Sequence, residues 1–145
     1  MNYRILGRTG LSVSVIGLGT EYLFGAGWDV VASVIGEAAD AGVNFIDLLG
    51  AEPGYRDNFG AAIRGRRDRF VLQGHLGAVY SNGQAYTARE LPACEDFFHD
   101  LLTRLGTDYV DVINIQVVDR RDDYEQIMGA GGLLEVAQRY QSQGK

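Results

Sequence analysis

The stretch VNFIDLLGAEPGYRDNFGAAI, residues 43–63, decides the fold. It opens with an apolar run that ends at a carboxylate, Asp47, passes through a loop broken by glycine and proline, and closes with a helical pattern over residues 55–63. Buried parallel strands read as continuous apolar runs, and α/β proteins place polar functional side chains at the carboxyl ends of such strands. We therefore predict a buried strand over residues 43–47, a helix over 55–63 and a functional Asp47 between them.

Similar segments recur along the chain. Thr87 and Glu90 have the spacing of a capping box, so we expect a helix to begin there and to end at Gly106, after a polar loop at residues 81–85. Asp29 is expected to cap an earlier helix that ends at Gly42. The remaining expected elements are a hairpin at 3–6 and 11–15, strands at 15–20, 70–75 and 109–116 (the last buried on both faces), and helical segments between 123 and 143 that break at 129–132.

Strand and helix thus alternate about four times, which predicts a parallel α/β sheet with right-handed crossovers. A Rossmann sheet would need its glycine fingerprint at the first helix, and Gly17, Gly19 and Gly25 do not have that spacing. A (β/α)8 barrel fits the alternation, but a complete one needs about 250 residues. The predicted fold class is α/β: a partial, half (β/α)8 TIM barrel with an N-terminal β-hairpin and about four parallel strands, forming one incomplete domain over residues 1–145.

Composition and charge restrict the class of partner and the compartment. The net charge of −6 disfavours nucleic acid and anionic membranes as partners. No run reaches about 18 consecutive apolar residues, and no basic region precedes an apolar core at the N-terminus, so neither a membrane span nor a signal peptide is expected. The single cysteine, Cys94, suits a reducing compartment. We expect a cytoplasmic protein.

Polar residues lie at four expected strand ends, which in a parallel barrel all meet at the catalytic mouth. Because side chains alternate along a strand, Gln73 shares a face with His75, and Asn114 shares one with Gln116. The strand-end residues are Thr20, Glu21, Asp47, His75 and Gln116. They could catalyse a reaction, or they could only hydrogen-bond one another and the loop backbone.

His75 is the sharpest of these candidates, since an imidazole can move protons near neutral pH or bind a metal. Glu52, in the loop after the second strand, could pair with it as a base or a ligand. Two such groups make a poor metal site because zinc usually takes at least three protein ligands, so no metal is assigned. His99 and Cys94 lie inside the expected long helix and are interpreted as ordinary helix residues.

Several segments together resemble the aldo-keto reductases. YRILGRTGLSVSVIGLGT is similar to the family's N-terminal hairpin and first strand, and GVNFIDL to its second strand with the catalytic aspartate. DNFGAAIRG resembles the helix that follows, and LLTRLGTDYVDVINI the third helix and fourth strand. The resemblance covers essentially the whole chain but only the first half of a full-length member. The runs PGYRDNFGAAI, GHLG, EDFFHDLLTRLGTDYVD and MGAGGLLE are most similar to the branch whose longer members carry a C-terminal iron–sulfur segment.

The resemblance implies NADPH- or NADH-dependent reduction of aldehydes and ketones, in which a tyrosine assisted by lysine, histidine and aspartate gives a proton to the carbonyl oxygen. Asp47 matches the aspartate. The other three positions carry Glu52 for the tyrosine, His75 for the lysine and Gln116 for the histidine. With the tetrad largely replaced, we expect the chain to be inactive alone, while a proton-transfer pair of Glu52 and His75 stays open.

The resemblance also implies NADP or NAD as cofactor and a small carbonyl compound as substrate. Gly19, Thr20, Glu21 and Asp47 could line the nicotinamide end. The groups that grip the cofactor phosphates in the family lie mostly in later strands, so that half of the site is absent here. No cysteine-rich iron–sulfur motif is present, since Cys94 stands alone.

A half barrel would leave its first and fourth strands as open edges. We expect either a homo-oligomer or a missing C-terminal half to cover them. Two alternatives to the oxidoreductase remain open: a non-catalytic half-barrel scaffold or interaction module that self-associates, and a metal-assisted lyase or hydrolase that uses Asp47, Glu52 and His75.

Overall fold

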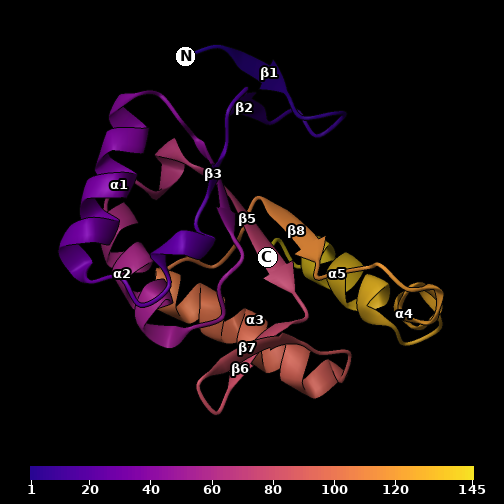
Figure 1. Ribbon diagram of the computed structural model, residues 1–145. Helices are drawn as coiled ribbons and strands as arrows, with labels where there is room; N and C mark the ends of the chain where they lie inside the picture. The colour runs from indigo at the N-terminus through magenta and orange to yellow at the C-terminus, as the bar shows by residue number, and fades with distance from the viewer.

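A four-stranded parallel sheet forms the centre of the molecule. The computed structural model describes residues 1–145. Its sheet contains β3 (Leu18–Gly19), β4 (Phe45–Leu48), β5 (Val71–Leu76) and β8 (Val112–Ile115), hydrogen-bonded side by side in this order. Every neighbouring pair is parallel, so the carboxyl ends of all four strands lie at one edge (Figure 1). This arrangement confirms the predicted partial barrel.

Helices connect the strands and pack on the sheet and on one another. α1 (Trp28–Asp40) leads to β4, α2 (Pro53–Ile63) to β5, and α3 (Leu91–Leu105) to β8. α4 (Arg121–Met128) and α5 (Leu133–Ser142) follow β8. α1 contacts α2, α2 contacts α3, and α5 contacts β8. None of these helices combines the length and the hydrophobicity that a bilayer-spanning segment needs.

The side chains of the sheet alternate between a buried face and an open one. Ile46, Leu48 and Leu72 are buried in the main hydrophobic core with the helices. Asp47 and Gln73 lie opposite each other in the register of β4 and β5, and both are partly exposed. The open face is the one that lines the interior of a closed barrel.

β8 is shorter and more exposed than the sequence predicts. Its Asn114 is exposed and the other three residues are only half-buried. The prediction of a strand buried on both faces is wrong, because β8 is an edge of this sheet and pairs with β5 alone.

Two hairpins lie at opposite ends of the sheet (Figure 1). β1 (Tyr3–Ile5) and β2 (Ser12–Ser14) pair antiparallel, as predicted. The backbone N–H of Ser14 donates to Asn44 Oδ1 at 2.7 Å, just before β4 begins. This hairpin therefore lies at the amino ends of the strands, away from the strand-end residues.

The second hairpin contradicts the predicted loop at 81–85. β6 (Ala78–Ser81) and β7 (Gln84–Thr87) pair antiparallel around Asn82 and Gly83, whose φ angles are 52° and 80°. Two successive positive φ angles are typical of a type I′ turn, for which Asn-Gly is the favoured pair. Thr87 is thus the last residue of a strand, and the predicted helix start there is wrong.

The helix starts differ from the predicted ones where a side chain was expected to cap. α3 begins at Leu91 after Glu90, which makes no side-chain cap. α1 follows Gly27, and Asp29 lies in its first turn without capping it. α2 begins at Pro53, earlier than predicted, because the side chain of Glu52 accepts hydrogen bonds from its first turn.

Candidate functional site

Three of the strand-end residues meet at the carboxyl edge of the sheet. Nε2 of His75, on β5, lies 2.6 Å from Oδ1 of Asp47, on β4. Nδ1 of the same ring lies 2.6 Å from Oε1 of Gln116, directly after β8. Gln73 donates from Nε2 to Asp47 Oδ1 at 2.9 Å. The structure therefore joins Asp47, His75 and Gln116, supported by Gln73, into one network, which we call the strand-end network.

The Asp47 carboxyl group is the part of this network that faces outward. Its side chain is 35 % exposed, and Oδ1 accepts both hydrogen bonds while Oδ2 accepts none. Burial acts to raise the pKa of Asp47, but the hydrogen bonds from His75 and Gln73 outweigh it and hold the pKa below its ordinary value of 3.8. The Asp47 carboxyl group is therefore ionised at neutral pH, and its Oδ2 can accept a hydrogen bond.

The His75 ring is buried and both of its nitrogens are occupied; the side chain is 6 % exposed. A neutral imidazole donates one hydrogen bond and accepts one. With Nε2–H donating to Asp47, the Gln116 carboxamide must present its NH2 group to Nδ1, whereas an imidazolium would donate to the oxygens of both partners. In either state His75 acts through Asp47 and does not itself face outward.

The residues assigned to the nicotinamide end line a small cavity beside Asp47. Its volume is about 250 Å³, and it is lined by Gly19, Thr20, Glu21, Tyr22, Asp47 and Leu49. The sequence did not single out Tyr22 or Leu49. Tyr22 lies in a short 3-10 helix (Glu21–Leu23) and is 91 % exposed, a feature that apolar periodicity cannot reveal.

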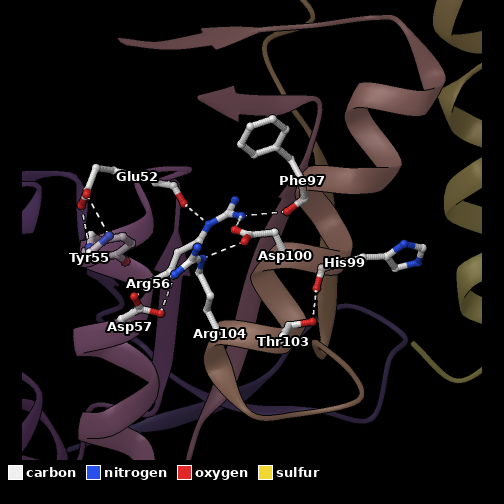
Figure 2. Close-up of polar contacts among 11 residues, drawn as sticks. Glu52, Tyr55, Arg56, Asp57, Phe97, His99, Asp100, Thr103 and Arg104 are labelled. Carbon is white, nitrogen blue, oxygen red and sulfur yellow. Dashed lines mark hydrogen bonds and ion pairs between the residues drawn. The ribbon is translucent and has the colours of Figure 1, made fainter. Parts of the chain in front are cut away.

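Glu52 does not join the strand-end network. Its Oε1 accepts from the backbone N–H of Gly54 at 2.8 Å and its Oε2 from that of Tyr55 at 2.5 Å, which makes it the cap of α2 (Figure 2). A carboxylate at a helix N-terminus is stabilised by the free N–H groups and by the helix dipole. The structure therefore brings Glu52 into contact with neither His75 nor Asp47. No group of three or more His, Cys, Asp or Glu side chains assembles where it could hold a metal ion.

Tyr55 lies behind the site. Its hydroxyl is hydrogen-bonded to Thr20 Oγ1, which also donates to the backbone carbonyl of Asp47 at 2.6 Å. The ring is 1 % exposed and packs edge-on against Phe24 at a centroid distance of 5.1 Å. Burial raises the pKa of Tyr55 far above its usual range, although the hydrogen bond with Thr20 acts in the opposite direction. Tyr55 thus supports the end of β4 as a neutral phenol.

Replacing His75 by alanine is expected to raise the pKa of Asp47. The change removes the hydrogen bond that lowers this pKa most, while much of the burial that raises it remains. Carboxyl ¹³C chemical shifts followed through an acid titration would measure the pKa directly. An unchanged Asp47 pKa in the variant would show that the contact with His75 is not made in solution.

The same group links folding stability to pH. Because the pKa of Asp47 is lowered by folding, its contribution to stability is fully present above the ordinary value of 3.8 and is lost as the pH falls through the folded value. In the His75 variant that contribution is smaller, so less stability should be lost on acidification.

Comparisons with known proteins show which family the chain resembles. The sequence profile of the Aldo/keto reductase family matches residues 15–142. The chain is 30 % identical over 131 residues to the aldo-keto reductase YhdN of Bacillus subtilis, a match that covers 82 % of this chain and 39 % of that protein. It is also 28 % identical over 134 residues to the oxidoreductase YqkF of the same organism, whose function is uncharacterised, covering 90 % and 44 %.

Solved structures agree with the sequence matches. The holo form of an aldo-keto reductase from Bacillus halodurans superposes with a TM-score of 0.71 at 26 % identity, covering 85 % of this chain and 43 % of that one. A protein of Pseudomonas aeruginosa assigned to the same family superposes with a TM-score of 0.70 at 28 % identity, covering 85 % and 49 %. A Klebsiella pneumoniae aldo-keto reductase in complex with NADPH superposes with a TM-score of 0.55 at 29 % identity, covering 72 % and 35 %.

The chain spans less than half the length of each of these relatives. Within that span the profile match takes in the sheet, the helices and every residue of the strand-end network. The chain belongs to the aldo/keto reductase family.

Proposed function

We propose that this chain supplies the nicotinamide-facing part of an NAD(P)H-dependent oxidoreductase barrel that acts on a small carbonyl compound, and that the chain alone does not reduce carbonyls. The observation that carries the proposal is the strand-end network. By resemblance, Asp47 matches the family's aspartate, and His75 and Gln116 stand at its lysine and histidine positions. The His75 ring lies 2.6 Å from Asp47 Oδ1 on one side and 2.6 Å from Gln116 Oε1 on the other.

The cavity beside Asp47 fits one end of a dinucleotide better than the whole of it. Pockets for drug-sized ligands have volumes of about 300–1,000 Å³, whereas this one measures about 250 Å³. Glu21 and Asp47 both line it, and two carboxylates disfavour a phosphate group. Gly19 lines the cavity, and a Cβ there would meet no atom within 4 Å. A bound nicotinamide would supply the hydride; these residues would orient its ring.

We expect this chain to lack a side chain that can donate a proton to the carbonyl oxygen. Carbonyl reduction needs a donor beside the carbonyl oxygen. Glu52, at the family's tyrosine position, is held by the first turn of α2, and Tyr55 is buried behind Thr20. The hydroxyl of Tyr22 makes no hydrogen bond to the strand-end network, while Asp47 Oδ2 is an acceptor. Asp47 therefore offers a hydrogen-bond acceptor at this place and carries no proton that it could give to a carbonyl oxygen.

NADPH binding tests the cofactor part of the proposal. Because the phosphate-gripping strands of the family are absent from residues 1–145, we expect no saturable quenching or shift of NADPH fluorescence up to about 1 mM cofactor, equivalent to less than about 4 kcal/mol of binding free energy. Asp47→Asn, which removes one of the carboxylates, is the matched variant. Micromolar affinity in the unmodified chain would contradict the proposal.

Self-association is a second candidate role, favoured by one observation. Exposed apolar residues flank both edge strands: Val15 and Ile16 precede β3, and Val117 and Val118 follow β8. Unpaired strand edges and exposed apolar side chains are the usual features of a surface that binds another chain. In this role the half barrel would be a scaffold that pairs with a second copy through its edges.

Sedimentation velocity at micromolar concentration separates the two candidates. Edge pairing predicts a concentration-dependent dimer that Ile16→Lys and Val118→Lys weaken together, whereas Tyr86→Lys, at an exposed position on β7 in a separate two-stranded sheet, leaves it unchanged. A stable monomer at all concentrations would eliminate the scaffold role.

Two finer assignments stay proposals. The placement closest to the iron–sulfur-associated branch is supported by runs such as GHLG and MGAGGLLE in the sequence. A cytoplasmic location is supported by the single, buried Cys94, which suits a reducing compartment.

A further inference from the structure

Arg89 joins three segments near the carboxyl end of β5. Its side chain is only 10 % exposed. Nη1 donates to the carbonyl of Ala88 at 3.1 Å, Nη2 donates to the carbonyl of Val117, and Nε donates to Asp123 Oδ1 at 3.2 Å. These partners belong to the base of the β6–β7 hairpin, to the loop after β8 and to α4. A single guanidinium group therefore fixes the positions of all three segments.

The same guanidinium and Gln116, the residue that contacts His75, both lie beside Gly77. A Cβ built on Gly77 would lie 3.3 Å from Arg89 Nη1 and 3.6 Å from Gln116 Cβ, so these groups share one small space. The backbone N–H of Gln116 donates to the carbonyl of Leu76 at 2.9 Å, which keeps Gln116 beside the end of β5. From there its side chain reaches His75 Nδ1 at 2.6 Å.

The bond to Val117 explains how Arg89 could act on Gln116. Val117 directly follows Gln116 and has a φ of 44°. A β-branched residue adopts this left-handed conformation only at a cost in free energy, because its Cβ crowds the backbone. Arg89 holds the carbonyl of this strained residue, one peptide bond after Gln116, whose own N–H is held by the carbonyl of Leu76.

We propose that Arg89 is a positioning residue for the strand-end network: by holding Val117 in the left-handed conformation, it keeps the Gln116 carboxamide on His75 Nδ1 and thereby keeps His75 on Asp47. The importance of this contact for chemistry rests on the proposed function, but the contact itself can be measured without any activity. Lysine cannot substitute for Arg89, because one ammonium group lacks the planar fork that reaches three separate acceptors.

The two histidines of the chain make the test specific. Long-range ¹H–¹⁵N spectra report the protonation and hydrogen bonding of each ring nitrogen, and His99, exposed on α3, is an internal reference. In Arg89→Lys we expect the His75 Nδ1 and Nε2 resonances to shift in the same direction as in Gln116→Ala, while those of His99 stay in place. Arg121→Lys, at an exposed arginine of α4, is the matched control and should shift neither ring.

A rescue experiment separates positioning from general stability. If Arg89 acts by holding a strained Val117, then Val117→Gly, which favours positive φ, should return the His75 resonances toward their original positions in the Arg89→Lys background. Asp123→Asn loosens Arg89 without removing it and should give a smaller shift in the same direction, which keeps the test usable if Arg89→Lys does not fold.

The His75 resonances of these variants show whether Arg89 positions Gln116. His75 resonances that move in Gln116→Ala but not in Arg89→Lys or Asp123→Asn would overturn the role of Arg89 and leave the strand-end network intact. Resonances that move in none of these variants would overturn both the inference and the geometry behind the proposed function. A shift in Arg89→Lys that Val117→Gly does not reverse would overturn the positioning mechanism.

Discussion

Replacing Arg56 by methionine is expected to lower the free energy of unfolding by about 3 kcal/mol, because it leaves two carbonyl groups and part of a carboxylate without partners in a buried place. Arg56 is 1 % exposed. Its Nε donates to the carbonyl of Gly50 at 2.9 Å, and its Nη1 donates to the carbonyl of Phe97 at 2.7 Å and to Asp100 Oδ2 at 2.8 Å. Figure 2 shows the side chain reaching from α2 to α3.

Methionine keeps the aliphatic stem, so the loss measures the polar contacts and not packing alone. Burial lowers the pKa of Arg56, and the carboxylate of Asp100 opposes this, but a guanidinium remains charged in either case. Urea unfolding followed by circular dichroism gives the free energy, and the thermal midpoint should fall by roughly 6–12 °C for a chain of this size.

Arg104 is the matched control, since it binds the same carboxylate from the solvent side. Its Nε donates to Asp100 Oδ1 at 2.7 Å and its Nη1 to Asp57 Oδ2 at 2.7 Å, while its side chain is 30 % exposed. Arg104→Met should cost less than about 1 kcal/mol, as expected for exposed ion pairs. Equal losses at the two positions would show that the buried contacts of Arg56 are not what holds α2 to α3.

Gly60→Ala is expected to cost about 2 kcal/mol or more, by overpacking the contact between α2 and α3. A Cβ at Gly60 would lie 2.2 Å from the carbonyl oxygen of Arg104 and 2.9 Å from Cα of Leu105. Both atoms belong to the backbone at the end of α3, so no side-chain rotation can relieve the clash and the two helices must move apart. The same urea titration measures the loss.

Replacing Gly36 by alanine is expected to have the opposite effect on the free energy of unfolding. It lies in the middle of α1, and a Cβ there would meet nothing within 4 Å. Gly36→Ala should therefore stabilise the chain by about 0.5–1 kcal/mol through helix propensity alone. A stabilising Gly60→Ala would mean that α2 and α3 do not approach as closely as the structure describes.

The sheet and the edge that carries the strand-end network could be predicted from local pattern, since buried strands are apolar and polar residues followed them in the sequence. The apolar run before Asp47 and the alternation of Gln73 and His75 placed those three side chains at one edge, where they contact one another. The burial of β8 was predicted wrongly. The apolar residues of β8 suit a strand with neighbours on both sides, whereas within residues 1–145 β8 pairs with β5 alone.

The remaining errors come from competition between local and long-range contacts. Thr87 and Glu90 have capping spacing, but Asn82 and Gly83 favour a tight turn that draws residues 84–87 into a strand, and backbone pairing across the hairpin prevails. Glu52 was expected to pair with His75, yet its carboxylate accepts hydrogen bonds from the free N–H groups of α2 instead. The place of Glu52 in the sequence did not reveal that the N-terminus of α2 would compete with His75 for its carboxylate.

The steady-state rate of NADPH oxidation in the presence of a simple aldehyde measures whether the isolated chain reduces carbonyls. We expect no rate above the protein-free blank, because Glu52 and Tyr55 cannot donate a proton to a carbonyl oxygen in the cavity beside Asp47. Asp47→Asn and Tyr22→Phe should be indistinguishable from the unmodified chain. Robust turnover that Asp47→Asn abolishes would show that the chain alone reduces carbonyls and that the proposed function is wrong.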